Sequence, residues 1–446
     1  MEWCFTKLYC VTPMAAFFVI FYAKIVNHLS FDKIFYSLIT FFTSFFILFA
    51  FVIYPNIDFF QMDNNKLDAL MQEYPHFKWY ISIIGNWSYV IFYSLSELWP
   101  NIFYVLLFWQ LANEITSSSE AKRFYTLFAL FGNLSLIIVG FIMMGLSSDN
   151  SFLSRLFMTS DNKIMLVKVS TLFTLIFSII SCLLVRYISK NIIRPLLGKD
   201  LYLTAKSKKK QMGVIQSFKY IVKSRYLWLM LICSASFGLT MNLVEAVWKA
   251  KLKSLYPTVS GYAMVNSIYI LLTGCVIVFM TLLGNKIMQR NRWFVSAVIS
   301  PLVILITGTM FFILVIFDDY FTSFFNQILF IVTPLYLSVI VGAIQNILSK
   351  GTKYSIWDAA RQMLYIPLDR ELKVKGKAAV DILSPKIGKS ASGFIQSLIF
   401  TVMPFVTYDS IAGFLMSVFI IVCILWIFAI REIGEEYENM IKNQKD

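Results

Sequence analysis

Runs of apolar residues long enough to cross a bilayer alternate with short polar segments along the whole chain. A membrane-spanning helix needs about 20 consecutive, predominantly apolar residues. Five such runs precede a long polar stretch and six follow it, at 8–28, 33–54, 79–112, 122–147, 164–187, 224–250, 262–284, 293–317, 324–349, 388–408 and 410–430. The pattern therefore predicts an all-α polytopic membrane protein with about 11 transmembrane helices.

The run at 79–112 is longer than a single spanning helix requires. It contains Glu97 and, three residues later, Pro100, and a proline inside a helix bends it. We interpret the run as one long, kinked helix that lines an interior. The alternative is that it contains two spans.

The long polar stretch divides the chain into two predicted domains. We expect an N-terminal helix bundle at 1–187, a basic cytoplasmic linker at 188–223, a C-terminal bundle at 224–431 and a cytoplasmic tail at 432–446. Many transporters consist of two equal halves, and the first half here is one helix short. The simplest explanation is that a front helix is absent from this chain or lies upstream of its start. If 79–112 contains two spans, no helix is missing.

Composition excludes several classes of protein. Hydrophobic residues make up 58% of the chain and charged residues 14%, against about 45–50% and about 25% in ordinary soluble domains. A soluble globular protein, a disordered chain and a disulfide scaffold are therefore excluded, and the strong hydropathy argues against a membrane β-barrel. We attribute the net charge of +14 to lysine and arginine in cytoplasmic loops rather than to nucleic-acid binding.

The distribution of basic residues also predicts the orientation. The segment 188–223 is strongly basic and has Asp200 as its one acidic residue, so the positive-inside rule places it in the cytoplasm. Counting spans from there puts the C-terminus inside and the N-terminus outside. The segment 251–261, with Lys251 and Lys253, is the exception to the rule.

Residues typical of metal centres and enzymes are sparse. The six cysteines lie mostly in apolar runs without a CxxC pair, and His28 and His76 lie in loop-like stretches. The GKS tripeptide at 388–390 does not complete a P-loop, because position 383 is Leu383 and no strand precedes it. We therefore expect neither a cofactor nor an enzymatic activity.

Two carboxylates lie inside the apolar runs, where ionisable groups are costly and are functional candidates. Glu97 is in the 79–112 run. The alternative to a functional role is that its carboxylate has a purely structural role and is satisfied by neighbouring Ser and Trp groups. Glu245 is in the first run of the second half, where Asn242 adds further polarity. Its structural alternative is an ion pair with Lys249, which lies four residues further along the same helix face.

Lysines at the ends of the runs form a second group of candidates. Lys7 and Lys389 each begin a span, and either can be an ordinary lysine at the membrane interface. The stretch 350–389 mixes aromatic residues with many lysines, including Lys377. It is compatible with a basic loop attracted to anionic lipid, whose 356–365 part lies at the membrane interface, or with a polyphosphate-binding surface.

Several longer motifs resemble those of one family. They are KYSIWDAARQMLYIPLDRELKVKGKAAVD at 353–381, GKSASGFIQ at 388–396, NLVEAVWKAKLK at 242–253, SELW at 96–99 and FWQLANEITSSSEAKRFYTLFALFGN at 108–133. These segments resemble the nucleotide transporters of plastids and obligate intracellular bacteria, the ATP/ADP translocase family. The resemblance covers nearly the whole chain.

The resemblance implies a major-facilitator-like fold of twelve helices in two six-helix bundles. It also implies that four charges important in the family correspond to Lys7, Glu97, Glu245 and Lys389, which contribute to substrate binding. The chain departs from the family at its front, where the family's first helix is missing. It departs again at Pro100, where the family usually has glycine.

The function implied is nucleotide antiport, with ATP exchanged for ADP by alternating access. We therefore expect a nucleotide as substrate and a monomeric carrier. We expect it to lie in the lipid bilayer of a bacterial inner membrane. Three alternatives remain at this point: transport of other nucleotides of the GTP, UTP or CTP type, proton-coupled symport of a small solute, and a shortened paralogue that is inactive or binds nucleotide without moving it.

Overall fold

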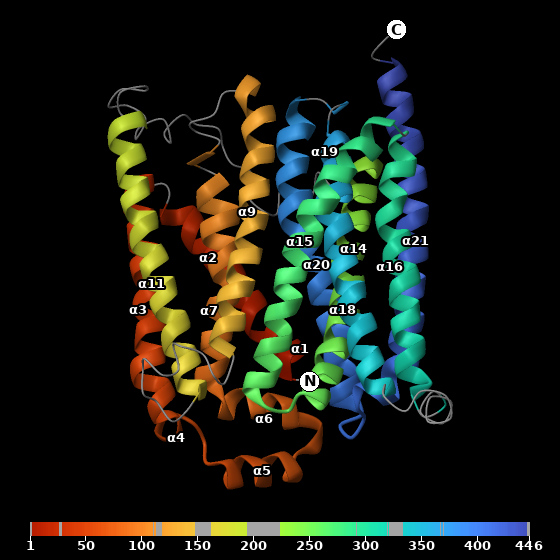
Figure 1. Ribbon diagram of the computed structural model, residues 1–446. Helices are drawn as coiled ribbons and strands as arrows, with labels where there is room; N and C mark the ends of the chain where they lie inside the picture. The colour runs from red at the N-terminus through yellow and green to blue at the C-terminus, as the bar shows by residue number, and fades with distance from the viewer. Residues whose placement is uncertain are drawn as a thin grey trace. The chain divides into compact units, whose positions relative to one another are not determined.

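Every regular element in the described part of the chain is a helix, and no strand occurs there (Figure 1). The computed structural model describes residues 2–25, 29–109, 111–112, 118–147, 162–193, 224–290, 292–318, 320, 333–365, 367–368 and 370–443. Helices suit a bilayer because they satisfy their own backbone hydrogen bonds.

Seven helices among the described residues are long and apolar enough to cross a membrane: Phe31–Phe60, Trp87–Phe108, Ile164–Asn191, Arg225–Leu255, Val259–Gly284, Trp293–Ile316 and Tyr408–Lys442. A shorter apolar helix covers Phe131–Leu146. The predicted class, an all-α polytopic membrane protein, is confirmed. The expected total of eleven spans stays a prediction.

The chain folds into two compact units. The amino-terminal unit comprises Glu2–Phe128 and Leu146–Lys210, and the carboxy-terminal unit comprises Ala129–Gly145 and Gln211–Asp446. The predicted domain limits at 187 and 224 stay a prediction, because most of the linker lies outside the described residues.

The amino-terminal unit contains long helices that are locally wound as π-helix. Its elements are α1 (Glu2–Thr6), η1 (Lys7–Val11), α2 (Thr12–Ile25), α3 (Phe31–Leu48), η2 (Phe49–Ile53), η3 (Tyr54–Asn56), α4 (Ile57–Phe60), α5 (Asn64–Glu73), η4 (Pro75–Phe77), α6 (Lys78–Gly85), α7 (Trp87–Pro100), η5 (Asn101–Phe108), α11 (Asn162–Ile188) and η6 (Ser189–Ile193). Aromatic packing dominates its core, where Phe42 and Phe46 of α3 meet Trp99 of α7 at ring-centroid distances of 5.7 Å. This packing uses the chain's abundant phenylalanine.

The predicted long helix at 79–112 is interrupted near its start. Asn86 has a non-helical backbone (φ −102°, ψ 31°), so α6 ends at Gly85 and the membrane-length helix begins at Trp87. The described part of the run therefore contains one membrane-length helix rather than two. The helix changes from α to π winding directly after Pro100, whose missing N–H interrupts the regular hydrogen bonding.

The carboxy-terminal unit is organised around one central helix. Its elements are part of α9 (Ser118–Ser147), α14 (Arg225–Leu255), α15 (Val259–Arg290), α16 (Trp293–Ile316), α18 (Pro334–Thr352), η9 (Lys353–Trp357), α19 (Asp358–Met363), α20 (Arg370–Val402) and α21 (Tyr408–Asn443). The central helix α14 packs against α18, α20 and α21 (Figure 1). Most of its side chains are therefore buried.

Glycines allow helices in this unit to approach closely, as small residues commonly do in membranes. A Cβ added at Gly388 of α20 would clash with the Ala235 carbonyl oxygen of α14. A Cβ added at Gly140 of α9 would lie 2.6 Å from Leu271 Cβ of α15. The second contact explains why residues 129–145 cluster with this unit.

The stretch after α18 corrects the expectation of a loop at the membrane interface. The helix continues through η9 and α19 to Met363, and Ile356, Trp357 and Ala360 are buried. The Trp293 indole N–H donates to the Ala360 carbonyl at 2.9 Å. The apolar spacing predicted the helix correctly, but its apolar face packs inside the carboxy-terminal unit.

The segment 432–446, which we predicted to be a cytoplasmic tail, is helical as far as it is described. Helix α21 runs to Asn443, and its Tyr437 is buried with its ring 5.6 Å from Trp293. Arg225 forms ion pairs with Glu432 and Glu436 of α21. The described part of the tail is therefore a continuation of the last helix that is attached to α14 and α16.

Candidate functional site

Glu245 and Lys249 form the first part of a charged site in the carboxy-terminal unit. Their side chains pair at 3.0 Å, one turn apart on α14, as the structural alternative for Glu245 anticipated. The charges also reach neighbouring helices, since Glu245 acts electrostatically on Tyr269 of α15 and on Lys350 of α18. The pair is thus part of a larger arrangement rather than an isolated surface contact.

Lys350 and Lys353 lie at the junction of α18 and η9. The Lys350 ammonium donates to the Tyr269 hydroxyl at 2.6 Å. The Lys353 ammonium lies 4.0 Å from the centroid of the Tyr354 ring and 3.5 Å from an Asp358 carboxylate oxygen. The other oxygen of Asp358 lies 3.5 Å from the Arg361 guanidinium, so two cations share this one carboxylate.

Lys389 enters the same neighbourhood from α20. Gly388 brings the α20 backbone against α14, and the Asn242 side-chain amide of α14 donates to the Lys389 carbonyl at 3.4 Å. Asn242 is 2% exposed, whereas the Lys389 side chain is exposed and acts electrostatically on Tyr354. In the GKS tripeptide Gly388 therefore packs against α14, and the charged side chain of Lys389 is exposed.

We call these groups the cationic cluster: Lys249, Lys350, Lys353, Arg361 and Lys389, with the carboxylates Glu245 and Asp358. The named groups of the cluster are five cations and two carboxylates, so positive charge outnumbers negative charge among them. Uncompensated charge is costly beside apolar membrane helices. The cluster is therefore suited to a ligand that carries several negative charges.

Lys7 has a different setting in the amino-terminal unit. It is the first residue of the π-helical segment η1, and the Thr12 hydroxyl donates to its carbonyl at 2.9 Å. Its ammonium lies 3.8 Å from the centroid of the Trp3 ring, a favourable cation–π distance. Short π-helical segments in membrane and soluble helices frequently occur at functional sites.

Glu97 lies in the same unit at a second helix irregularity. Its carboxylate accepts a hydrogen bond of 2.9 Å from the Tyr93 hydroxyl, and its carbonyl accepts one of 2.8 Å from the Asn101 side chain. Pro100 and the π-helical η5 follow directly. Because α7 packs against η1, Glu97 and Lys7 lie on adjacent elements.

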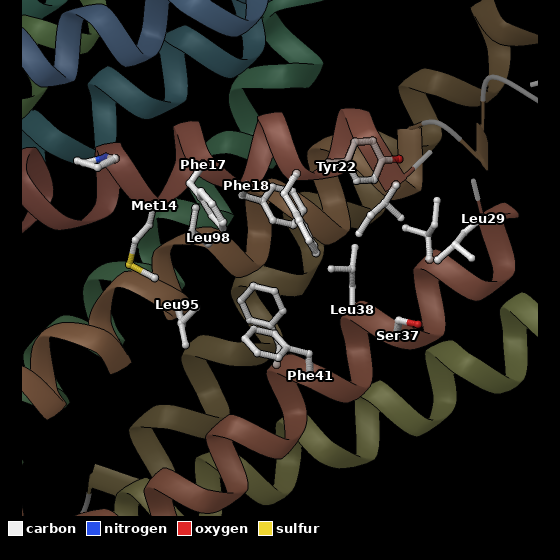
Figure 2. A pocket seen from close by; sticks show the side chains of 15 residues that line it. Met14, Phe17, Phe18, Tyr22, Leu29, Ser37, Leu38, Phe41, Leu95 and Leu98 are labelled. Carbon is white, nitrogen blue, oxygen red and sulfur yellow. The ribbon is translucent and has the colours of Figure 1, made fainter. Parts of the chain in front are cut away.

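The cavity in the amino-terminal unit offers a contrasting environment. It has a volume of about 670 Å³ and is lined by side chains of α2, α3 and α7. Figure 2 shows that these are almost entirely aromatic and aliphatic, with Ser37 and Tyr22 as the polar exceptions. Among the described side chains that line it, none is charged, so these side chains offer no counter-charge to a phosphate group.

Some predicted features cannot be placed. Lys377 belongs to α20, but its side chain lies outside the described residues, as do His28 and most of the 188–223 segment. In the described ranges, no group of three or more His, Cys, Asp or Glu residues is arranged to hold a metal ion.

Sequence reasoning missed Lys350, Lys353 and Tyr269. Both lysines directly follow an apolar run, so they were interpreted as part of a basic loop. The available signal was the continued helical spacing of Ile356 and Ala360, which carries the helix past Lys353.

Membrane-length helices that carry a cluster of cations are typical of a polytopic membrane transporter for an anionic substrate. Residues 3–437 match the model of the TLC ATP/ADP transporter family. The chain belongs to this family, and the resemblance in the sequence is confirmed.

Curated relatives support the assignment. ADP,ATP carrier protein 5 of Rickettsia bellii is 59% identical over 436 residues, which cover 98% of this chain and 87% of the relative. The protein of the same name in Rickettsia prowazekii has the same identity and coverage. ADP,ATP carrier protein 1 of Rickettsia bellii is 38% identical over 444 residues, with 98% and 87% covered. No solved structure matches the chain.

Proposed function

We propose that this chain exchanges ATP for ADP across a bacterial inner membrane by alternating access. The observation that carries the proposal is the cationic cluster, in which five cations face two carboxylates beside apolar helices. Family membership and the names of the Rickettsia carriers support adenine nucleotides as the substrates.

Lys7 and Lys389 are proposed to bind phosphate oxygens. Lysine is a compact point charge on a flexible stem, which favours binding that can also be released. The exposed Lys389 side chain is held in place through its backbone, by Asn242 and by the close contact at Gly388. The Lys7 ammonium lies 3.8 Å from the centroid of the Trp3 ring, at the start of the π-helical segment η1.

The two glutamates are proposed to hold positive charge in place when substrate is absent. Glu245 already pairs with Lys249, which supports this role. Glu97 accepts a hydrogen bond from Tyr93 at the irregularity before Pro100. Both carboxylates also repel phosphates that bind in the wrong place.

Exchange rather than one-way transport follows from the excess positive charge. Moving uncompensated charge through a low-dielectric environment is costly, whereas a bound polyphosphate lowers that cost. The empty carrier is therefore expected to reorient slowly, so one nucleotide must bind before another can be carried back.

We also propose a cytoplasmic C-terminus and a monomeric carrier. Lys251 was the exception to the positive-inside rule, and it pairs with Asp318 at 3.1 Å and Asp409 at 3.0 Å. Because its charge is compensated within the protein, it does not count against an outside location. This supports the predicted orientation.

The test is an exchange assay in intact bacteria that express the chain. Cells are loaded with labelled ATP and then chased with unlabelled ATP, ADP, GTP or CTP. We expect saturable uptake and efflux of label on chasing with ATP or ADP, and much less with GTP or CTP. Efflux driven by GTP or CTP instead would assign a different nucleotide set.

A proton-coupled symporter gives a distinct result in the same cells. Uptake would then follow the pH gradient and would not require a counter-substrate inside the cell.

The exchange assay is also run on two variants and compared with wild type. They are Lys389→Gln and the control Lys253→Gln, which changes an exposed lysine at the end of α14. Exchange is expected to fall about tenfold in Lys389→Gln and to stay at the wild-type rate in Lys253→Gln.

A further inference from the structure

The cavity between α2, α3 and α7 of the amino-terminal unit has its polar side chains at one end (Figure 2). Met14 lies at the apolar end, whereas Tyr22 and Ser37 lie at the other. Phe17 of α2 and Phe41 of α3 also line the cavity and are 71% and 58% exposed, so the described residues leave it open on one side. The lining therefore matches an amphiphile with a long apolar part and a polar end.

The length of the cavity fits one leaflet of a bilayer. Its lining on α2 extends from Pro13 to Ile25, which lie about 18 Å apart along the helix axis at 1.5 Å per residue. The hydrocarbon core of a bilayer is about 30 Å thick, so one leaflet contributes about 15 Å. A spanning helix of another protein crosses the whole core, whereas an acyl chain covers one leaflet. The length of the lining therefore favours an acyl chain as the occupant.

A basic side chain lies next to the polar end of the cavity. Lys33 is exposed at the start of α3, directly before the lining residue Ile34 and one turn before Ser37 on the same helix face. The Ser189 hydroxyl of η6 donates to the Asp32 carboxylate at 2.9 Å. This hydrogen bond joins the end of α11 and η6 to the start of α3.

Two further exposed cations, Arg186 and Lys190, are close to Ser189 in the chain and so lie at the same end of the unit. The basic segment 188–223 begins here, and the positive-inside rule assigns it to the cytoplasm. Each lysine or arginine near the inner leaflet strengthens binding to anionic lipid by about fivefold. The charge at this end is therefore complementary to an anionic headgroup.

We propose that the cavity binds one anionic phospholipid of the cytoplasmic leaflet. One acyl chain fills the space between α2 and α3, and the headgroup phosphate lies outside the cavity, beside Lys33. Arg186 and Lys190 add attraction over a longer range. Lipid binding at this place is independent of which nucleotide the carrier exchanges.

The test titrates phosphatidylglycerol or phosphatidylcholine into the purified, delipidated full chain and follows the bound lipid by native mass spectrometry. Wild type should bind one phosphatidylglycerol at least about tenfold more tightly than phosphatidylcholine. Lys33→Gln should weaken phosphatidylglycerol binding about fivefold and change phosphatidylcholine binding by less than about twofold. The control is Lys66→Gln, which changes an exposed lysine on α5 of the same unit and should alter neither affinity.

A matched pair of variants on α3 tests the apolar part of the site. Ser37 lines the cavity, whereas Thr40 is exposed on the same helix and is not one of the lining residues. A phenyl group at position 37 displaces about two methylene groups of the acyl chain, so Ser37→Phe should weaken binding of both lipids about tenfold. Thr40→Phe should keep both affinities within about twofold of wild type. If Ser37→Phe elutes as aggregate, the comparison of Lys33→Gln with Lys66→Gln decides the question.

A phosphatidylglycerol with a photoreactive group at the end of one acyl chain gives the location of the site. We expect crosslinks on α2 near Met14 and Phe17, at the apolar end of the cavity. Crosslinks spread evenly over the membrane helices would mean ordinary surrounding lipid only and overturn the proposal. Equal affinities of wild type for the two lipids also overturn it. So does a mass of two copies of the chain that is lost in Ser37→Phe, since a second copy would then occupy the cavity.

Discussion

Lys251 and the cationic cluster lie in the same unit, yet their charges are balanced in opposite ways. Lys251 is 6% exposed and faces two carboxylates, Asp318 and Asp409. In the cluster, five cations share two carboxylates. In the first region carboxylates outnumber the cation, and among the named groups of the second region cations outnumber carboxylates.

The difference separates a structural charge from one that awaits a ligand. Lys251 ties the end of α14 to the end of α16 through Asp318 and to the start of α21 through Asp409. Its loss should therefore affect stability. If the cluster binds the anionic substrate, as proposed, its loss should affect binding and exchange and leave the fold intact.

The largest expected effect comes from removing both carboxylates around Lys251. The double variant Asp318→Asn with Asp409→Asn leaves a buried ammonium without a counter-ion, which costs about 3–5 kcal/mol. We expect a marked fall in the thermal unfolding midpoint in detergent. Asp409→Asn alone, which leaves Asp318 in place, is the control and should be milder; equal midpoints for both variants would refute the structural role.

The next effect concerns the helix contact that positions Lys389. Gly388→Ala places a Cβ against the Ala235 carbonyl and should destabilise by about 1–3 kcal/mol, as overpacking does. Gly413→Ala in α21 is the matched control, since a Cβ there meets nothing within 4 Å. Helix propensity alone favours alanine by about 1 kcal/mol at both sites, so only a clash separates the two. Similar thermal midpoints would mean that α14 and α20 can move apart at no cost.

A charge of the cluster should show the opposite behaviour. Lys389→Gln removes an exposed ammonium, so the thermal midpoint should stay within about one degree of wild type, since surface substitutions are usually near neutral. The kcat/KM for ATP exchange should fall about tenfold, or about 1.4 kcal/mol. A variant that instead unfolds early and still transports would reverse the assignment of the two regions.

The fold was predictable where apolar length decides the structure. About 20 apolar residues suffice to indicate a span, and the membrane-length helices of the structure fall on the predicted runs. The break at Asn86 was missed, although the Gly85-Asn86 pair is a turn signal, because the apolar run continues on both sides of it. The buried packing of Trp357 and Tyr437 was also missed, since both follow the end of an apolar run.

The candidate site was predictable only where a charge interrupts an apolar run. Glu97 and Glu245 stand out for this reason. Lys350 does not, because a lysine at the end of a run has the same pattern whether it reaches toward headgroups or turns inward to Tyr269. Only the position of α15 beside α18 distinguishes the two cases.

The smallest expected effect extends the comparison to Lys7, whose charge faces an aromatic ring. Trp3→Leu removes the ring below the ammonium and keeps an apolar side chain, so it costs about 0.5–1 kcal/mol of cation–π energy. If Lys7 binds substrate, Trp3→Leu should raise the KM for ATP about two- to fivefold. Trp3→Phe retains a ring and should raise the KM less. Lys7→Gln in the same assay gives the full contribution of the charge. Should Trp3→Leu and Trp3→Phe behave alike, the ring merely fills space, and Lys7 would need another group to hold it.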